Sequence, residues 1–501
     1  MRIGFDNDKY LSIQSEHIRE RIGQFGDKLY LEFGGKLFDD YHASRVLPGF
    51  HPDSKMRMLL QLSDMAEIVI VINAADIEKN KMRGDLGITY DIDVLRLIGE
   101  FEKRGLYVGS IVITHYEGQS GARQFKERLE RRNIRVYLHY TIEGYPANVP
   151  LIISEEGFGK NDYIETKRPL VVVTAPGPGS GKMATCLSQL YHENKRGIKA
   201  GYAKFETFPI WNLPLKHPVN MAYEAATADL NDVNMIDPFH LEAYGETTVN
   251  YNRDIEIFPV LSAMFEAIFG ESVYKSPTDM GVNMAGFCIV DDEACCEASR
   301  QEIIRRYFRA ATEYAVGANG SGPVERIELL MRDLGLKAED RRVVVPAREA
   351  AEDGRRRGKG FQGIFTGAAI ELPDGTIVTG SNSPTMHAAS GAVLNAIKRL
   401  AGLPDKLHLL PPEVIRQIVY LKSDILHENE HSLNLDELLV ALSMSASANP
   451  AAEAAMAQLP ALRDCEMHLT HIVAPGDDSG LRRLGLRPTS DPKFRTASLL
   501  A

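Results

Sequence analysis

The stretch Pro169-Leu-Val-Val-Val-Thr-Ala-Pro-Gly-Pro-Gly-Ser-Gly-Lys182 joins an apolar run to a glycine-rich turn, and a helix-like run, Cys186 to Tyr191, follows it. The β-branched residues predict a buried strand over 169–174. A strand, a glycine-rich turn and a helix in this order are typical of an α/β sheet, whose ligands bind at the carboxyl ends of its strands. The stretch therefore predicts an α/β fold and a candidate site at the edge of its sheet.

Strand-like and helix-like runs alternate on both sides of this stretch. Such alternation with short connections predicts a parallel sheet covered by helices, a Rossmann-like region over residues 1–240. The glycine-rich turn at 175–182 is its P-loop-like feature. The expected strands are 29–33, 67–73, 107–114, 134–138, 169–174 and 198–204, and the expected helices are 54–65, 92–104 and 123–132.

The pattern changes beyond residue 240. Residues 241–357 predict a mainly α-helical insert, and residues 358–501 predict a further α/β and helical region. The second of these begins with an expected hairpin at 363–379, for which Asp374-Gly375 is the turn signal. Further helices are expected at 255–269, 292–317, 324–335, 347–357, 385–401 and, rich in small residues, 441–459.

The composition argues against several classes of protein. The net charge is −11 and the pI about 5.8, so we expect neither a nucleic-acid partner nor a membrane partner. The longest apolar run, 66–75, is too short to span a bilayer, and the N-terminus lacks the apolar segment of a signal peptide. The five cysteines are odd in number and contain no CxxC pair, which is typical of a reduced, cytoplasmic protein.

The glycine-rich turn resembles a phosphate-binding loop but departs from its pattern at two positions. Pro176 replaces the first glycine, and Met183 replaces the serine or threonine whose hydroxyl holds magnesium. Backbone amides and a helix N-terminus can still bind an anion there, although a glycine-rich turn that binds nothing is the alternative. The predicted phosphate-binding residues are Gly177, Gly179, Ser180, Gly181 and Lys182.

Other polar segments are candidates for contacts with the same ligand. The glycine-bearing loops at 32–36 and 115–121 also follow strands, so three loops would form one crevice at the sheet edge. A long irregular segment begins at Lys204, and a hydroxyl-rich segment covers 274–284. Helix capping is an equally good interpretation of the second segment. The possible contacts are Lys204, Lys275, Ser276, Thr278, Asp279, His387 and His471.

Two patterns suggest zinc: the first is a literal match in a poor context, and the second lacks essential residues. His427-Glu428-Asn-Glu-His431 matches HExxH, which places two imidazoles on one helix face. Its polar surroundings predict a solvent-facing helix end instead, so zinc is not an expected cofactor. The hairpin at 363–379 and the helix after it resemble the nucleoside deaminases, with His387 at the start of the helix. The glutamate of that family is replaced by Ala389, and 411–415 lacks the cysteines of PCxxC. This resemblance implies a cytidine-deaminase-like fold without zinc chemistry.

Four stretches together resemble a bacterial family catalogued as domain of unknown function eighteen-forty-six. The resemblance extends over nearly all of residues 1–490. It implies a shared fold but no established activity, substrate or catalytic residue, so no role is carried over. The stretches are APGPGSGKMATCLSQLYHE (175–193), ADLNDVNMIDPFHLEAYG (228–245), YKSPTDMGVNMAG (274–286) and HLTHIVAPGDDSGLRRLGL (468–486).

These observations predict a protein that binds a nucleotide or another phosphorylated small molecule at 175–182, and a transferase or hydrolase reaction on that ligand is a further expectation. A metal hydrolase built on His427, Glu428 and His431 is the second class, and a non-catalytic binding or scaffold protein is the third. The apolar faces expected on helices 292–357 and 441–459 predict a homo-oligomer, most simply a dimer.

Overall fold

The computed structural model describes residues 2–26, 28–35, 37–38, 40–83 and 87–495. The chain forms two compact units, Met1–Ser299 and Arg300–Ala501, and the division falls inside helix α13 (Asp292–Ala315). The boundaries predicted at residues 240 and 357 do not coincide with this division, because the region 241–357 contributes helices to both units.

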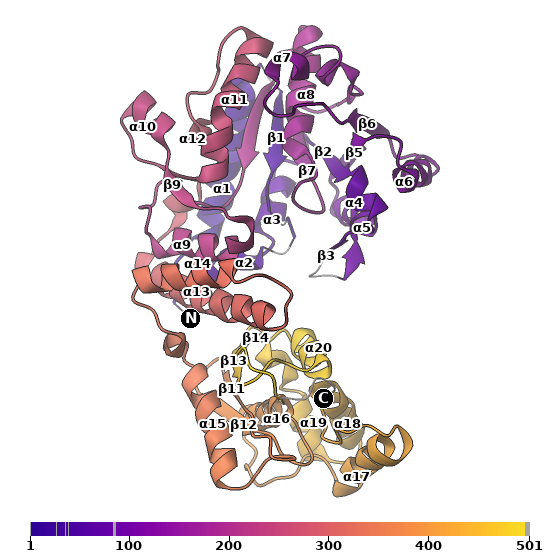
Figure 1. Cartoon of the computed structure of the whole chain (residues 1–501), viewed down its shortest axis with the longest axis vertical. Helices are drawn as coiled ribbons and strands as arrows, with labels where there is room; N and C mark the ends of the chain where they lie inside the picture. Colours follow the sequence, from indigo (N-terminus) through magenta and orange to yellow (C-terminus); the bar gives the residue numbers. More distant parts are fainter. Residues whose placement is uncertain (1, 27, 36, 39, 84–86, 496–501) are drawn as a thin grey trace. The chain divides into compact units, whose positions relative to one another are not determined.

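The first unit is built on a six-stranded parallel sheet with the order β6-β5-β2-β7-β1-β8 (Figure 1). The predicted strand before the glycine-rich turn is confirmed as β7, and it lies between β2 and β1. Leu170 of β7 is in register with both Leu29 and Ala66, so the carboxyl ends of these strands meet at one edge. The strands are β1 (Leu29–Phe33), β2 (Ala66–Asn73), β5 (Tyr107–Tyr116), β6 (Val136–Tyr140), β7 (Leu170–Thr174) and β8 (Gly201–Phe205).

Both faces of this sheet are covered. Val171 and Val173 belong to a core shared with helices α8 (Lys182–Lys195) and α11 (Asn252–Phe269), while the intervening Val172 is equally buried on the opposite face. Successive strand residues point to opposite faces, so a run of buried β-branched residues requires helices on both sides. Figure 1 shows α8 and α11 beside the strands. Helix α5 (Tyr90–Lys103) also packs on the sheet, where it contacts β2 and β5.

The remaining elements of the first unit are short or connect the strands. Two small antiparallel pairs join β3 to β4 and β9 to β10. The elements are α1 (Asn7–Gln24), α2 (Tyr41–Val46), α3 (Ser54–Leu60), α4 (Ala74–Glu78), β3 (Met82–Arg83), β4 (Ile88–Thr89), α5 (Tyr90–Lys103), α6 (Ser120–Glu130), α7 (Val149–Ile152), η1 (Phe158–Lys160), α9 (Pro218–Ala226), η2 (Ala228–Leu230), β9 (Asn234–Ile236), α10 (Pro238–Tyr244), β10 (Val249–Tyr251), α12 (Pro277–Met280) and η3 (Ala285–Cys288).

Helix α1 is absent from the predicted elements. Its buried face includes the polar residues Asn7, Gln14 and Ser15, which interrupt the apolar periodicity that identifies a helix. These groups are satisfied by contacts far along the chain: the Gln14 amide donates to the carbonyl of Val282, and the Ser15 hydroxyl donates to Gln61 at 2.9 Å. Tertiary hydrogen bonds therefore replace the apolar signal.

The second unit contains a four-stranded sheet with the order β12-β11-β13-β14. The predicted hairpin is confirmed as the antiparallel pair β11 and β12, and Gly375 takes the left-handed conformation (φ +82°) that its turn requires. Ala369 faces a small core with helix α15, whereas Ala368 and Ile370 face the larger core with α16. The elements are α14 (Gly322–Asp333), η4 (Ala338–Asp340), α15 (Val344–Arg356), β11 (Gly367–Glu371), β12 (Ile377–Ser381), α16 (Ala388–Leu400), α17 (Pro412–Tyr420), the π-helical turn η5 (Leu421–Ile425), α18 (Leu435–Ala446), α19 (Pro450–Met456), η6 (Leu459–Leu462), β13 (Glu466–Leu469), α20 (Pro475–Leu484) and β14 (Arg487–Ser490).

The single small-residue helix predicted over 441–459 is wrong. The chain forms α18 and α19 there instead, because Pro450 cannot continue a helix and Asn449 caps the new one by accepting from the amide of Ala451 at 3.0 Å.

None of the helices in the described part of the chain has both the length and the hydropathy of a membrane-spanning segment.

Candidate functional site

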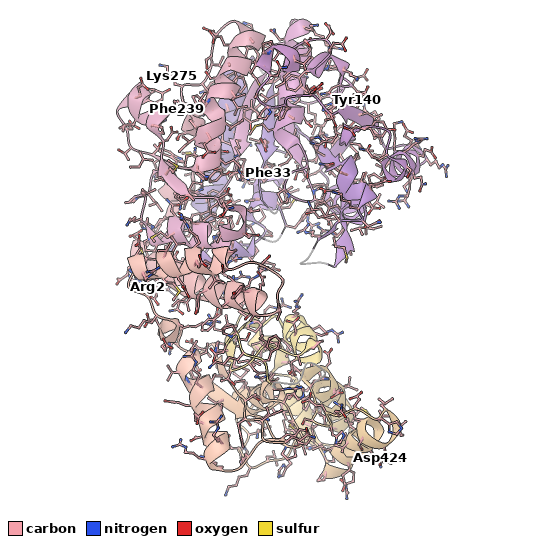
Figure 2. The ribbon with its side chains drawn as sticks, in the orientation of Figure 1. Arg2, Phe33, Tyr140, Phe239, Lys275 and Asp424 are labelled. Atoms are coloured by element: carbon pink, nitrogen blue, oxygen red, sulfur yellow. The ribbon has the colours of Figure 1, made fainter. Side chains whose placement is uncertain are left out.

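A cavity of about 750 Å³ opens at the carboxyl edge of the parallel sheet. The ends of β1, β7 and β8 form its floor, and Phe33, labelled in Figure 2, marks the end of β1. Side chains of α5 and α11 complete the wall. This is the edge at which open α/β sheets bind ligands.

The glycine-rich turn at 175–182 lies on this cavity and holds a fixed conformation. Gly179 and Gly181 have φ values of +72° and +86°, and Gly181 is the N-cap of α8. Two loop carbonyls are bound from neighbouring strands: Thr114 of β5 donates to Ser180 at 2.7 Å, and Asn73 of β2 donates to Gly179 at 3.4 Å. The loop carbonyls are therefore used inside the protein.

The amides of the same loop are left for a ligand. In the described part of the chain, the amides of Gly179, Ser180 and Gly181 donate to no protein acceptor. Gly177, Gly179 and Lys182 line the cavity, whereas Ser180 and Gly181 do not, and Ser180 is buried. Unused amides at the start of a helix, whose dipole favours negative charge, are a feature that anion-binding sites share.

Lys182 is the cation of the cavity wall that is still available to a ligand. Arg83 pairs with Asp93 at 2.8 Å, and Arg253 lies 3.1 Å from a carboxylate oxygen of Asp232. Lys204 forms ion pairs with both Asp254 and Glu206. Among the described residues, the Lys182 ammonium has neither an ion pair nor a hydrogen bond, although it is only partly exposed.

The opposite part of the cavity is acidic. Glu32, Glu206 and Asp254 line it around Lys204, whose Nζ lies 2.6 Å from Asp254 and 3.3 Å from Glu206. Burial lowers the pKa of Lys204, but the surrounding carboxylates, Asp254 first, raise it above its ordinary value. Lys204 therefore stays charged and serves as the counter-ion of this group rather than as a free phosphate contact.

Glu206 is the titratable group with the chemistry best suited to acid–base work. Burial raises the pKa of its carboxyl to about 7; the charge of Lys204 opposes this shift, and Asp254 and Glu32 add to it. A carboxyl that titrates near neutral pH can both take and give a proton. Gly34 packs against it, since a Cβ at position 34 would lie 2.6 Å from Cγ of Glu206.

The other predicted loops behave differently. The loop after β1 lines the cavity through Gly34 and Gly35, and Lys36 lies outside the described residues. The loop at 115–121 does not line it; there the amide of Gly121 donates to Glu78. Instead, Thr114, directly before that loop, supports the glycine-rich turn.

The hydroxyl-rich segment around α12 is occupied by capping contacts. Ser276 caps α12 by accepting from the amide of Asp279 at 3.1 Å. Thr278 donates to Asp237 at 2.7 Å, and Asp279 accepts from the amide of Lys275 at 2.9 Å. None of these four residues lines the large cavity, and Figure 2 labels Lys275 on the ribbon beside α12. Capping, the structural interpretation weighed above, accounts for this segment.

In the second unit, His387 and His471 lie together on a small pocket, where His387 is held between two carboxylates. Its Nδ1 is 2.7 Å from Asp477 and its Nε2 is 2.8 Å from Glu430. Burial lowers the pKa of His387, but the hydrogen bonds to the two carboxylates outweigh it and raise the pKa to about 9. His387 is therefore an imidazolium at neutral pH, with Nδ1 donating to Asp477 and Nε2 at ion-pair distance from Glu430, and a protonated ring cannot bind a metal.

The HENEH segment does not have the geometry of a zinc protease. Residues 427–431 are not helical, His427 has a left-handed backbone (φ +55°), and its side chain is exposed. His431 Nε2 instead lies 2.8 Å from the carbonyl of Glu428. Two imidazoles four residues apart face one metal only on a helix, so His427, Glu428 and His431 lack the arrangement required by the metal-hydrolase alternative.

Comparison with known proteins covers both units. Residues 3–335 match the model described as domain of unknown function DUF1846, N-terminal, and residues 339–500 match the corresponding C-terminal model. The chain belongs to the DUF1846 family. A DUF1846 relative from Streptococcus pneumoniae, named "UPF0371 protein", is 55% identical over 494 residues, with 98% of each chain covered. A protein of the same name from Corynebacterium aurimucosum is 56% identical over 499 residues, with 99% of this chain and 98% of that protein covered. One from Clostridium botulinum is 55% identical over 500 residues, covering 100% of this chain and 99% of the other. These names state no ligand for the DUF1846 family, so the site rests on its geometry.

Several wall residues of the cavity were not predicted. Glu206 carried a usable signal, since it stands two residues after Lys204 at a strand end and so points the same way. Asp254, Arg253 and Tyr90 carried none, because they belong to helix starts far along the chain. Tyr90 also explains Gly177: a Cβ at that position would lie 2.3 Å from the tyrosine hydroxyl.

Proposed function

We propose that this protein binds a phosphorylated small molecule, a nucleotide or a phosphosugar, in the cavity at the carboxyl edge of its parallel sheet. The phosphate lies on the amides of Gly179 to Gly181 and against the ammonium of Lys182. The observation that carries the proposal is that Gly179, whose amide is unused, and Lys182, which has no ion pair among the described residues, line the same cavity wall. A charge-assisted contact to such a lysine is among the stronger hydrogen bonds in proteins.

The acidic part of the cavity selects the rest of the ligand. Carboxylates accept hydrogen bonds, so Glu32, Glu206 and Asp254 suit a body that carries hydroxyl or amino groups. They repel a second phosphate. The volume of 750 Å³ exceeds what an inorganic anion needs and falls in the range of small-molecule sites.

A transferase or hydrolase reaction on this ligand would use Glu206. Its pKa of about 7 lets it take a proton from a hydroxyl or a water molecule, or return one to a leaving group. Met183 lines the cavity where a phosphate-binding loop of the usual pattern has its magnesium hydroxyl, and a thioether is a poor ligand for magnesium. Phosphate binding at the loop is therefore proposed to need no magnesium.

The experiment is calorimetric titration of the full chain with inorganic phosphate, a pentose phosphate, a hexose phosphate, AMP and ATP, each with and without magnesium. Binding of a phosphate monoester that Lys182→Ala weakens supports the proposal. The proposal fails if none of these compounds binds, or if Lys182→Ala leaves the affinity unchanged, and the scaffold alternative then stands. Strict dependence on magnesium would overturn the role assigned to Met183.

For the second unit, we infer a deaminase-like fold that has lost the zinc chemistry. The hairpin β11–β12, followed by a helix that begins directly after His387, supports this inference. The helix that faces His387 is α20, which contributes Asp477, rather than the segment 411–415 considered from sequence. Carboxylates lie against both nitrogens of His387, so we assign this residue a structural role rather than a metal-binding role.

We also propose a cytoplasmic location for the protein, from its cysteine content alone.

A further inference from the structure

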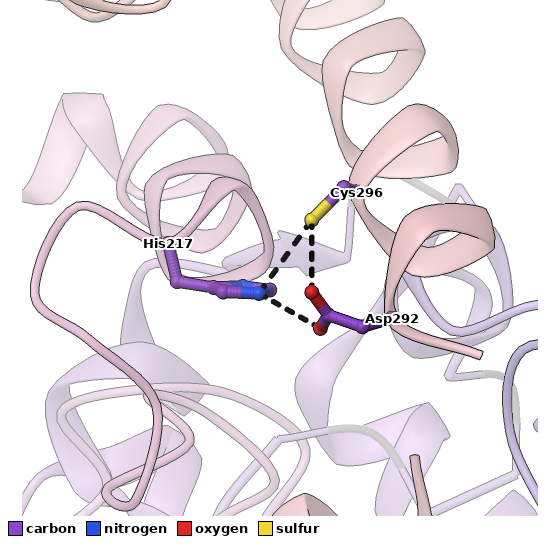
Figure 3. Close-up of side chains that lie close together, drawn as sticks. All are labelled: His217, Asp292 and Cys296. Atoms are coloured by element: carbon purple, nitrogen blue, oxygen red, sulfur yellow. Dashed lines mark hydrogen bonds and ion pairs between the residues drawn. The ribbon is translucent and has the colours of Figure 1, made fainter. Parts of the chain in front are cut away.

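A second cluster of reactive side chains lies outside the large cavity. His217, Asp292 and Cys296 come together in the first unit, as Figure 3 shows. His217 is the N-cap of α9, while Asp292 and Cys296 stand one turn apart in the first turns of α13. Among the described residues, this is the group whose histidine, cysteine and carboxylate donor atoms lie close enough to hold one metal ion.

The donor atoms lie within a few tenths of an ångström of the separations in a tetrahedral zinc site. Nε2 of His217 lies 3.0 Å from Oδ1 of Asp292 and 3.5 Å from Sγ of Cys296. The same sulfur lies 3.7 Å from Oδ2 of Asp292. Zinc bonds of about 2.0–2.3 Å at a tetrahedral angle predict ligand separations of about 3.3–3.6 Å.

The orientation of the histidine also suits a metal. The amide of Val219 donates to Nδ1 of His217 at 3.3 Å, which leaves Nε2 directed at the other two side chains. Without a metal, Nε2 of His217 can donate to Oδ1 of Asp292, while the thiol of Cys296 donates to Oδ2 of the same carboxylate. A divalent cation at this point would satisfy all three groups.

We propose that His217, Asp292 and Cys296 bind one zinc ion, with water as the fourth ligand. A thiolate ligand disfavours magnesium and calcium, and the mixture of sulfur, nitrogen and oxygen suits zinc. His217 is nearly buried, whereas the Asp292 side chain is 63% exposed, so solvent reaches the open side. The site links the start of α13 to the loop before α9. None of the three residues lines the large cavity in the described structure, so this proposal is independent of the proposed phosphate site.

The test is zinc titration of full-length protein from which metal has been removed, in competition with a chromophoric chelator. One zinc per chain is expected. Cys296→Ser and His217→Gln should each weaken binding by more than about tenfold, since even loss of a group behind a ligand typically weakens it by 10–100-fold. Cobalt provides a second readout: the wild type should show a thiolate-to-cobalt charge-transfer band, and Cys296→Ser should lack it while keeping its far-ultraviolet circular dichroism.

The matched control is the double variant His427→Ala/His431→Ala, which removes the histidines of the HENEH segment. It should keep the zinc and the cobalt band. The proposal is overturned if the wild type binds no zinc, if Cys296→Ser binds it as tightly as the wild type, or if the control variant loses it. Zinc affinity should also fall as the pH is lowered, because the thiol and the imidazole must lose protons to bind the metal.

Discussion

The Nζ atom of Lys204 lies 2.6 Å from Oδ2 of Asp254, so the buried lysine of the cavity is already neutralised by a residue 50 positions away. This pair decides which cation meets a ligand. Because Lys204 is paired with Asp254 and Glu206, Lys182 is the charge partner assigned to the proposed phosphate ligand.

Lys182→Ala is expected to weaken the binding of a phosphate monoester by about 1.5–3 kcal/mol, the value of one hydrogen bond to a charged group. Isothermal titration calorimetry measures the change. Lys195→Ala is the control, because this lysine lies at the other end of the same helix and pairs with Glu155. Equal affinities in the two variants would show that charge alone, and not the position at the loop, governs binding.

Gly179→Val is expected to destabilise the loop and to abolish anion binding. Nothing lies within 4 Å of the position of an added Cβ, so crowding is not the cause. The cause is the φ of +72°, which costs an L-residue with a Cβ about 1–2 kcal/mol. Thermal unfolding and calorimetric titration report the two effects.

Gly99→Ala is the control for this substitution. Gly99 lies inside α5, also has open space around its Cβ position and does not have a positive φ. An alanine there should leave binding unchanged and stabilise the helix by up to about 1 kcal/mol. If Gly179→Val binds phosphate like Gly99→Ala, the loop conformation is not needed for the site.

Glu206→Gln tests the carboxyl with the raised pKa. The folded protein holds this proton up to about pH 7, whereas the unfolded chain loses it near its ordinary pKa. The unfolded chain therefore binds fewer protons in this window, so the free energy of unfolding falls as the pH rises from the ordinary glutamate pKa through about 7.

The glutamine variant lacks this titration, so it should gain stability over the wild type by roughly 1 kcal/mol at about pH 8, a modest value because the carboxyl is partly exposed to screening by solvent. At acidic pH the two proteins should unfold alike. Urea unfolding at both pH values measures the difference. A constant difference across the range would mean that Glu206 has an ordinary pKa.

The local signals in the sequence were sufficient for the centre of the fold. The β-branched run of β7, the glycines after it and helix α8 all lie within 26 consecutive residues, Leu170 to Lys195. The strand was predicted within one residue of its observed bounds, whereas the helix-like run at 186–191 covers only the middle of α8. The wall of the candidate site that is proposed to bind phosphate is part of this same segment, so its position at the sheet edge could be predicted with the fold.

The acidic wall could not be predicted in the same way. Glu206 and Asp254 meet only because β8 and the start of α11 fold against each other, which no periodicity in either segment records. The type of residue alone did not identify a contact with the ligand. Ser276 and Thr278 were candidates for substrate contacts, and their hydroxyls are used in local and tertiary hydrogen bonds. The zinc candidate at His217 joins residues 75 positions apart.

The predicted homo-oligomer now has a candidate surface. Val440 and Met444 stand one turn apart on α18 and are 63% and 65% exposed. Helix α17, which contacts α18, and the turn after α17 carry the further exposed apolar side chains Tyr420, Leu421, Ile425 and Leu426. Exposed apolar patches mark interfaces.

Light scattering at micromolar concentration is expected to give the mass of a dimer, and Val440→Glu/Met444→Glu should shift it toward the monomer. The control, Ile92→Glu, places the same charge on an exposed apolar residue of α5, outside the helices expected at the interface. A monomeric wild type would contradict the prediction, and an unchanged dimer in the double variant would exclude this surface.

The imidazolium of His387 should make the stability of the second unit depend on pH. Its pKa is about 9 in the folded chain, above the ordinary histidine value of about 6.5. The stabilisation by Asp477 and Glu430 is therefore complete below the ordinary value and is lost as the pH rises through about 9. The Glu430 carboxyl, whose pKa its partners lower to about 2, stays charged throughout this range. Each pKa unit corresponds to about 1.4 kcal/mol, so the free energy of unfolding should fall by roughly 3 kcal/mol over this range.

Urea unfolding of the wild type and of His387→Gln, followed by circular dichroism at about pH 6 and about pH 10, measures this loss. The variant keeps a hydrogen-bond donor but no charge, so the wild type should be more stable at the lower pH and the difference should vanish at the higher one. If the wild type and His387→Gln differ equally at both pH values, His387 is not an imidazolium held by its two carboxylates.

His471 should make the stability depend on pH in the acidic range. Burial lowers the pKa of His471 to about 4, so protonating its ring destabilises the fold as the pH falls below the ordinary histidine pKa. His471→Gln should remove the destabilisation between about pH 6 and pH 4 and leave the alkaline transition in place.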